Sequence, residues 1–278
     1  MKKYSTSRSS RPDQLAVLDI ETIAPPVADG GFPPWPTHSP VVASVLTASR
    51  ERYGQWRFTL ETVDFLTGSA EAIERVSHLI ENRDLVTYNG RGFDLPVLAL
   101  TAMKHQRFDL VGISEAWQSH RFSGRHHDLA DIMSGFGGAR GASLEMLCAQ
   151  LGVLVKQDCH GSDVAELMAK GNFKAIANYC ESDVVGTGIL HACIAGFRSR
   201  DANYAASFIS QLGRWIADSK LAHLKAFERI NGHDELDRLS LLAVVEEGIA
   251  ALDHRQSLKF VSNMPGPSGL FVSKASDF

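Results

Sequence analysis

A short apolar segment near the N-terminus ends in two carboxylates, and it constrains the fold strongly. QLAVLDIET, at residues 14–22, is rich in Val, Leu and Ile and predicts a buried strand. Residues two apart on a strand point to the same face, so Asp19 and Glu21 share one face and Ile20 points to the core. Two such carboxylates repel each other unless a cation lies between them. The alternative is a solvated strand end, where acidic residues are common.

The segments that follow have the order expected of an α/β protein. Residues 24–40 hold six of the ten prolines and predict a loop. Two strands, joined antiparallel by a tight turn at Tyr53–Gly54, come next, and then helices alternate with one more strand. The predicted strands are 14–22, 40–48, 55–63 and 84–89, and the predicted helices are 69–82, 93–106, 143–152, 161–171 and 172–198. We therefore expect an α/β fold with a mixed β-sheet flanked by helices.

The length of 278 residues suits one large domain with a small addition. We expect a flexible N-terminal tail at 1–13, the α/β domain at 14–200 and a helical C-terminal extension at 201–278. Helical patterning continues over 204–260, and the Pro- and Gly-containing end is expected to be loosely ordered. The helical segment suits dimerisation, capping of a substrate or docking of a partner protein, and nothing in it separates these.

Composition excludes several classes of protein. A net charge of −4 and a pI near 6.3 argue against binding of nucleic acid by bulk charge, although not against contact with phosphate through bound metal ions. No segment approaches the ~18 apolar residues of a membrane-spanning helix, so we expect no membrane association. The four cysteines form no CxxC pair, which favours a reducing, cytoplasmic location.

A third carboxylate follows the strand predicted at 84–89. In YNGRGFDLPVL, Asp94 comes after a glycine-containing turn and begins a helix. Asp94 alone suits an ordinary helix N-cap, and Asn89 suits an ordinary turn residue. In the functional interpretation Asp94 joins the acidic pair, Asn89 contacts a phosphate or sugar, and Phe93 offers a stacking surface for a base.

The long helix predicted at 172–198 carries a tyrosine and a fourth carboxylate. Tyr179 and Asp183 are four residues apart in NYCESDV, so they lie on the same face of the helix. Their neighbours Ile176 and Val184 are apolar, which indicates that this face points inward. A structural hydrogen bond between the tyrosine and the aspartate is the simpler interpretation of the pair by itself.

Together these residues indicate a metal site more strongly than any does alone. We call them the four carboxylates: Asp19, Glu21, Asp94 and Asp183. Buried like charges persist only when cations neutralise them, and carboxylate oxygens suit Mg²⁺ or Mn²⁺. Two such ions, roughly 4 Å apart, stabilise the entering water and the leaving oxygen when a phosphodiester is hydrolysed.

The same motifs resemble a known family. LDIET, YNGRGFDLPVL and NYCESDV are similar to the three exonuclease motifs of the DEDD superfamily, tyrosine subclass. HDLADIM, SLEMLCAQLG and IANYCESDVVGT are similar to the predicted 3′–5′ exonucleases related to the proofreading domain of family B DNA polymerases. The resemblance covers about residues 14–195. It implies an RNase H-like fold, two divalent metal ions and removal of nucleotides from a 3′ end.

The resemblance also implies a role for each residue. The four carboxylates would bind the metal ions and Tyr179 would orient the attacking water. Separately from the resemblance, we expect Thr22, Asn89 and Phe93 to contact the substrate. The other subclass has histidine five residues before the last aspartate, where this chain has Asn178, so Tyr179 is the better candidate. Tyrosine's pKa of about 10 makes it a poor base at neutral pH, so we expect it to orient water without removing its proton.

Three functions are consistent with these residues. The first is a 3′–5′ exonuclease acting on single-stranded DNA, and the second is a 3′–5′ exoribonuclease. The third is a catalytically silent scaffold that binds nucleic acid, whose expected signature is the loss of an acidic ligand; all four are present here. Phe32 and Trp35, in the proline-rich loop, suit stacking on bases or simple packing of the loop. The partners we expect are nucleic acid and either a recruiting protein or a second copy of the chain.

Overall fold

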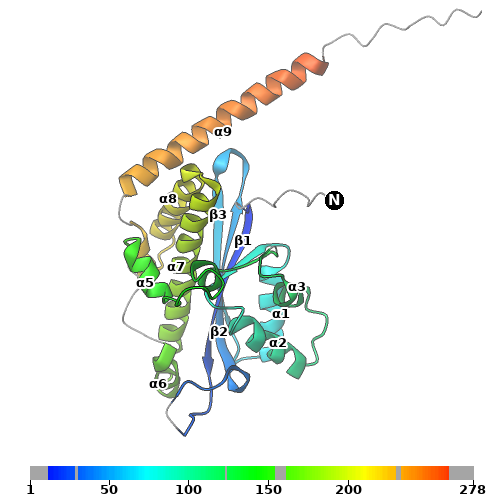
Figure 1. Ribbon diagram of the computed structural model, residues 1–278, viewed down its shortest axis with the longest axis vertical. Helices are drawn as coiled ribbons and strands as arrows, with labels where there is room; N and C mark the ends of the chain where they lie inside the picture. The colour runs from blue at the N-terminus through cyan, green and yellow to red at the C-terminus, as the bar shows by residue number, and fades with distance from the viewer. Residues whose placement is uncertain (1–11, 29–30, 123, 154–160, 230–232, 263–278) are drawn as a thin grey trace, which may run out of the picture.

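A five-stranded mixed sheet lies at the centre of the computed structural model (Figure 1). The structure describes residues 12–28, 31–122, 124–153, 161–229 and 233–262. The strands are β1 (Gln14–Ile23), β2 (Ser39–Arg50), β3 (Trp56–Asp64), β4 (Asp84–Thr87) and β5 (His126–Asp128), in the spatial order β3-β2-β1-β4-β5. β1, β2 and β3 pair antiparallel, whereas β4 pairs parallel to both β1 and β5.

Helices cover both faces of this sheet. Figure 1 shows α1, α2 and α3 on one side and α7 and α8 on the other. The α-helices are α1 (Ser69–Ile80), α2 (Asp94–Lys104), α3 (Val111–Gln118), α4 (Leu129–Met133), α5 (Leu144–Gln150), α6 (Val164–Ala169), α7 (Phe173–Ser199), α8 (Ala202–Asp218) and α9 (His233–Ser262). Short 3-10 helices are η1 (Trp35–Thr37), η2 (Arg52–Gly54), η3 (Gly161–Asp163) and η4 (Ala222–Phe227). The predicted α/β fold, with a mixed sheet flanked by helices, is confirmed.

The alternation of side chains along β1 assigns its two faces to different helices. Leu15 and Val17 belong to the apolar cluster that includes Val184 and Val185 of α7. Their neighbours on the strand, Ala16, Leu18 and Ile20, belong to the cluster formed with α1, α2 and α3. Because side chains alternate, Asp19 and Glu21 continue the row of Leu15 and Val17 and face α7.

The C-terminal helices continue from the same core. Tyr204 and Phe208 of α8 are fully buried and pack edge-on against Trp56 of β3, with ring centroids 5.6 and 5.1 Å apart. α9 then packs against α8 and η2 through its N-terminal half and extends beyond the rest of the structure (Figure 1).

The structure adds elements that the sequence pattern did not predict. β5, α3 and α4 were not predicted, because β5 is a three-residue strand of polar residues and the two helices are short. The predicted antiparallel turn is present, and both Tyr53 and Gly54 have positive φ angles, of 64° and 69°.

Two predictions fall largely outside the described residues. The predicted flexible tail, apart from residues 12 and 13, and the predicted loose end after residue 262 are not described. Across the part of the chain that is described, none of the helices has the length and apolar character needed to span a membrane.

Candidate active site

Three of the four carboxylates meet between β1 and α7. One oxygen from each of Asp19, Glu21 and Asp183 lies within 4.8 Å of the other two. The site forms because Asp19 and Glu21 share the face of β1 against which α7 packs. Glu21 is buried, and Asp19 and Asp183 are partly buried, so little water reaches the group.

Asp94 joins this group from the start of α2. It is only 4% exposed, and its Oδ1 accepts a hydrogen bond of 3.2 Å from the backbone N–H of Ile20. This bond fixes the start of α2 against the end of β1. The charge of Asp94 raises the pKa of both Asp19 and Glu21, so it acts on the same site although it lies outside the tight group of three.

Burial and mutual repulsion make ionisation of the four carboxylates costly. Burial is the largest cause of a pKa far above the usual value for Asp19 and for Glu21, and the neighbouring carboxylates add to it. Burial also raises the pKa of Asp94 and of Asp183 to about 7. A group of this kind carries its full negative charge at neutral pH only when cations are bound.

The donor set fits a hard divalent cation. Every member offers carboxylate oxygens, which Mg²⁺ and Mn²⁺ prefer. A thiol lies beside the set: Cys180 of α7 is fully buried, with its Sγ 3.5 Å from Oδ2 and 3.4 Å from the backbone oxygen of Asp19. Burial raises the pKa of Cys180 well above its usual range, so at neutral pH this thiol donates to Asp19 and is no thiolate ligand.

Tyr179 lies on the same face of α7 and is hydrogen-bonded to Asp183. Burial is the main cause of a raised pKa for this tyrosine, and the charges of Asp183, Glu21 and Asp19 raise it further. The phenol therefore stays protonated at neutral pH. It is placed to donate a hydrogen bond beside the carboxylates.

Aromatic rings gather next to the end of β1. We call Phe32, His38 and Phe93 the aromatic cluster. The His38 ring stacks on Phe32 and meets Phe93 edge-on, each with centroids 4.9 Å apart, and its Nδ1 lies 2.7 Å from Oγ1 of Thr22. The structure thus joins Thr22 and Phe93, both predicted substrate contacts, through His38. Phe32 is 78% exposed, so the cluster offers an open ring surface.

Asn89 lies in the turn that leads from β4 to α2. Its φ angle is 63° and the residue is exposed to solvent. Asp128, at the end of β5, holds this turn: its carboxylate accepts hydrogen bonds from the backbone N–H groups of Asn89 (2.9 Å) and Arg91 (2.8 Å). The turn also requires Gly90, because a Cβ there would lie 2.6 Å from the side chain of Thr87.

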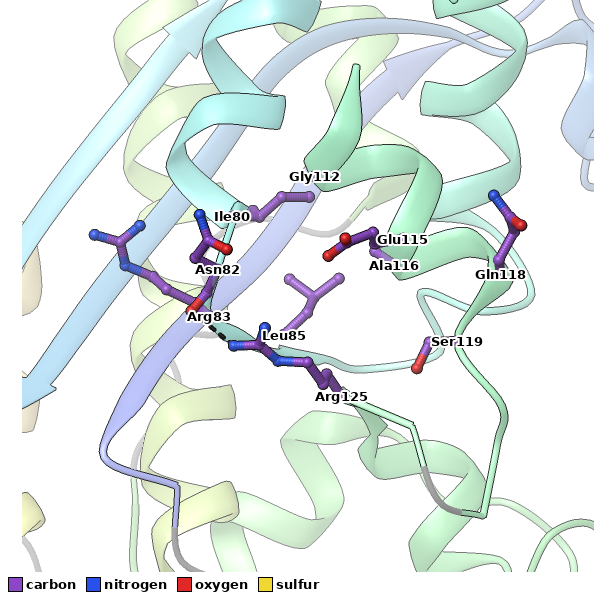
Figure 2. Close-up of a pocket in the computed structure, with 10 residues that line it drawn as sticks. All are labelled: Ile80, Asn82, Arg83, Leu85, Gly112, Glu115, Ala116, Gln118, Ser119 and Arg125. Atoms are coloured by element: carbon purple, nitrogen blue, oxygen red, sulfur yellow. Dashed lines mark hydrogen bonds between the residues drawn. The ribbon is translucent and has the colours of Figure 1, made fainter. Parts of the chain in front are cut away.

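The pocket in Figure 2 is separate from this site. Its volume is about 460 Å³, and it lies among the end of α1, the start of β4, α3 and Arg125. Ile80 and Leu85, in its lining, belong to the apolar cluster on the α1–α3 face of the sheet. The four carboxylates gather around the α7 face and the end of β1, so this pocket forms no part of their site.

Comparisons with known proteins agree with the motifs. Residues 31–230 match the family described as predicted 3′–5′ exonucleases related to the exonuclease domain of PolB. The matched range is 200 of the 278 residues and includes Asp94, Tyr179 and Asp183. Asp19 and Glu21 precede it, and the structure places them against Asp183. A search of curated proteins found no significant match.

Two solved structures resemble part of the chain. A family B DNA polymerase from the hyperthermophilic archaeon Pyrobaculum calidifontis is 19% identical, with a TM-score of 0.44 over 71% of this chain and 26% of that one. A structure described as exonuclease I (apo) is 16% identical, with a TM-score of 0.36 over 74% of this chain and 46% of that one. The chain therefore spans less than half the length of either structure. On the family match, which covers most of its length, the chain belongs to the predicted 3′–5′ exonucleases related to the exonuclease domain of PolB.

Proposed function

We propose that this protein is a metal-dependent 3′–5′ exonuclease that hydrolyses terminal phosphodiester bonds. The observation that carries the proposal is the grouping of Asp19, Glu21 and Asp183 within 4.8 Å, with Asp94 beside them. The four carboxylates would hold two divalent ions, Mg²⁺ or Mn²⁺. Bound ions would supply positive charge to neutralise the carboxylates and to stabilise the charge that develops on the phosphate and the leaving 3′-oxygen.

The protein's own residues position the reactants. Water attacks phosphorus, the bond to the 3′-oxygen of the preceding nucleotide breaks, and a nucleoside 5′-monophosphate leaves. The Tyr179 hydroxyl hydrogen-bonds the attacking water and fixes its direction. The aromatic cluster stacks on a base near the 3′ end, since every base offers a π face to an aromatic ring.

Single-stranded DNA is the favoured substrate. The support is the family's relation to the proofreading domain of a DNA polymerase, which is an analogy and not a property of the site. The alternatives are a 3′–5′ exoribonuclease and a scaffold that binds nucleic acid without cleaving it. We place the protein in the cytoplasm.

Degradation of labelled strands tests this function. Single-stranded DNA and RNA, labelled at the 5′ end, are incubated with the protein in Mg²⁺, Mn²⁺ or EDTA. We expect a ladder that shortens from the 3′ end in either metal and intact strands in EDTA, with DNA cleaved faster than RNA. Faster cleavage of RNA would favour the exoribonuclease, and strands bound but intact in both metals would favour the scaffold.

Replacing Tyr179 with phenylalanine is expected to lower kcat by about 10- to 100-fold with little change in KM, because one hydrogen bond to the water is lost. Mn²⁺ affinity, measured by calorimetry, should stay near the wild-type value. Tyr204→Phe is the matched control, since its hydroxyl donates to the backbone oxygen of Pro12, away from the site. Full activity of the Tyr179→Phe enzyme would contradict the role of this residue.

A further inference from the structure

A second group of rings lies on the loops that flank β5 and α4. We call Arg121, Phe122 and Phe136 the outer cluster. The two rings meet edge-on with centroids 4.6 Å apart, and the Arg121 guanidinium lies 5.8 Å from the Phe122 centroid and 5.5 Å from the Phe136 centroid. Phe122 is 65% exposed, so most of its ring is open to solvent. An open ring beside an exposed cation offers the two contacts that a nucleotide uses, a stacking face and a positive charge.

The backbone holds Phe136 in a costly conformation. Its φ angle is 59°, between Gly135 at 60° and Gly137 at 92°. The N–H of Phe136 donates a hydrogen bond of 2.6 Å to the backbone oxygen of Asp131, which closes the loop after α4. A positive φ is unfavourable for a bulky residue, and residues held in this way are concentrated at binding and catalytic sites. The loop therefore fixes the ring beside Phe122.

Positive charge exceeds negative charge around the outer cluster. Asp131 faces two guanidinium groups, because it pairs both with Arg121 and, at 3.5 Å, with Arg91. Arg140 is exposed, and no described residue pairs with its side chain. The segments 119–127 and 132–144 contain no acidic residue. In a chain with a net charge of −4, this local surplus suits a polyanion.

The turn between β4 and α2 joins the outer cluster to the aromatic cluster. Arg91, in this turn, pairs with Asp131, which pairs in turn with Arg121. The Arg91 Nη1 also donates a hydrogen bond of 2.8 Å to the backbone oxygen of Ser119, at the start of the loop that carries Phe122. Two residues after Arg91, Phe93 belongs to the aromatic cluster. One turn thus connects both groups of rings.

The segment 128–145, which carries Phe136, begins and ends beside the four carboxylates. At its start, the charge of Asp128 raises the pKa of Asp94. At its end, the charge of Glu145 raises the pKa of Asp183. The outer cluster therefore lies within reach of a strand whose end is bound at the four carboxylates.

We infer that the outer cluster binds single-stranded nucleic acid upstream of the nucleotide that is removed. Phe122 stacks on a base, and Arg121 and Arg140 contact phosphates. The inference rests on the proposed function, because it takes the 3′ end of the strand to lie at the four carboxylates. Stacking and phosphate contact do not depend on sequence, so the cluster holds any strand long enough to reach it.

Binding of unlabelled strands to the full chain in EDTA, where the proposed nuclease is inactive, tests the stacking contact. Three strands compete with a labelled one: twelve thymidines, three thymidines, and a twelve-nucleotide strand that is abasic except for its three 3′-terminal nucleotides. Phe122→Ala should weaken binding of the twelve thymidines by about 10-fold, because a stacked base is lost. Binding of the other two strands should stay at the wild-type value, which also shows that the variant is folded.

Phe108→Ala is the matched control. Phe108 is 78% exposed and lies between α2 and α3, so its loss should leave binding of all three strands unchanged. A Phe122→Ala protein that binds the twelve thymidines like wild type would overturn the inference. Equal loss of affinity for the three thymidines would also overturn it, because a contact upstream cannot act on a strand too short to reach it.

Salt dependence tests the phosphate contact. Each phosphate contact on a single strand adds about 0.7 to the slope of log K against log salt concentration, so Arg140→Ala should lower the slope for the twelve thymidines by about 0.7. Arg52→Ala is the matched control, since Arg52 is exposed on η2, next to the edge strand β3 at the other side of the sheet. An unchanged slope for Arg140→Ala would overturn the phosphate contact.

The inference and the proposed function fail separately. Loss of upstream binding in Phe122→Ala, together with strands that stay intact in Mg²⁺ and Mn²⁺, would overturn the nuclease and leave the strand site in place. Cleavage that depends on metal, together with binding that ignores Phe122→Ala, would overturn the strand site alone.

Discussion

Replacing Asp19 with asparagine lowers the rate of single-stranded DNA cleavage by about 10³-fold or more. Asparagine keeps the size of the side chain and one oxygen, but it removes the negative charge. Asp19 lies close to both Glu21 and Asp183 and accepts a hydrogen bond from the thiol of Cys180. The charge of Asp94 also raises its pKa, so Asp19 is the carboxylate that interacts with all the others. Cleavage is measured in single-turnover reactions with Mg²⁺, and DNA binding is followed separately.

The control for this variant is Asp109→Asn. The Asp109 side chain is 73% exposed and pairs with Arg107, away from the site, so its loss should leave cleavage unchanged. Circular dichroism confirms that both variants are folded. An Asp19→Asn enzyme with cleavage within tenfold of wild type would show that the carboxylates do not form the catalytic centre.

In EDTA at pH 8, Asp183→Asn unfolds at a higher temperature than wild type. Burial raises the folded-state pKa of Asp183 from its ordinary value of 3.8 to about 7. At low pH the group is protonated in both states and has no effect. Between pH 4 and 7 the unfolded state ionises first, so wild type loses stability as pH rises, and above pH 7 the loss is complete. Asparagine cannot ionise, so the variant escapes a loss of about 4 kcal/mol, or about 7 °C in Tm.

Differential scanning calorimetry from pH 4 to pH 8 measures this difference. The variant should match wild type near pH 4 and exceed it at pH 8. Mg²⁺ should raise the Tm of wild type more than that of the variant, because bound cations favour the ionised carboxylates. A variant less stable than wild type at pH 8 in EDTA would mean that Asp183 is not strained by burial and repulsion.

Period-two and helical patterns predicted the core of the fold. The alternation of side chains along the apolar run of β1 predicted that Ile20 points into the core and that Asp19 and Glu21 point to the opposite face of the strand. The i, i+4 spacing placed Tyr179 and Asp183 on one face of α7. Both predictions follow from local backbone geometry, so the sequence alone was enough to make them. β5 was missed because pairing with β4, and not its own composition, makes HHD a strand.

The residues that sequence reasoning missed reach the site through long-range contacts. His38 joins Thr22 to Phe93 across a proline-rich loop, and no spacing rule connects these positions. Asp128 holds the Asn89 turn from a strand 39 residues away. Cys180 was the exception: it precedes Asp183 by three residues on a helix, so the same-face rule would have placed it beside the carboxylates.

Diffraction from crystals soaked in Mn²⁺, with anomalous differences recorded near the manganese edge, tests the metal site most directly. We expect two anomalous peaks about 4 Å apart, within bonding distance of the four carboxylates, in wild type. The Asp19→Asn crystals should lose one or both peaks. An active wild-type protein whose crystals bind Mn²⁺ elsewhere, with the four carboxylates free of metal, would contradict the proposed function of this site.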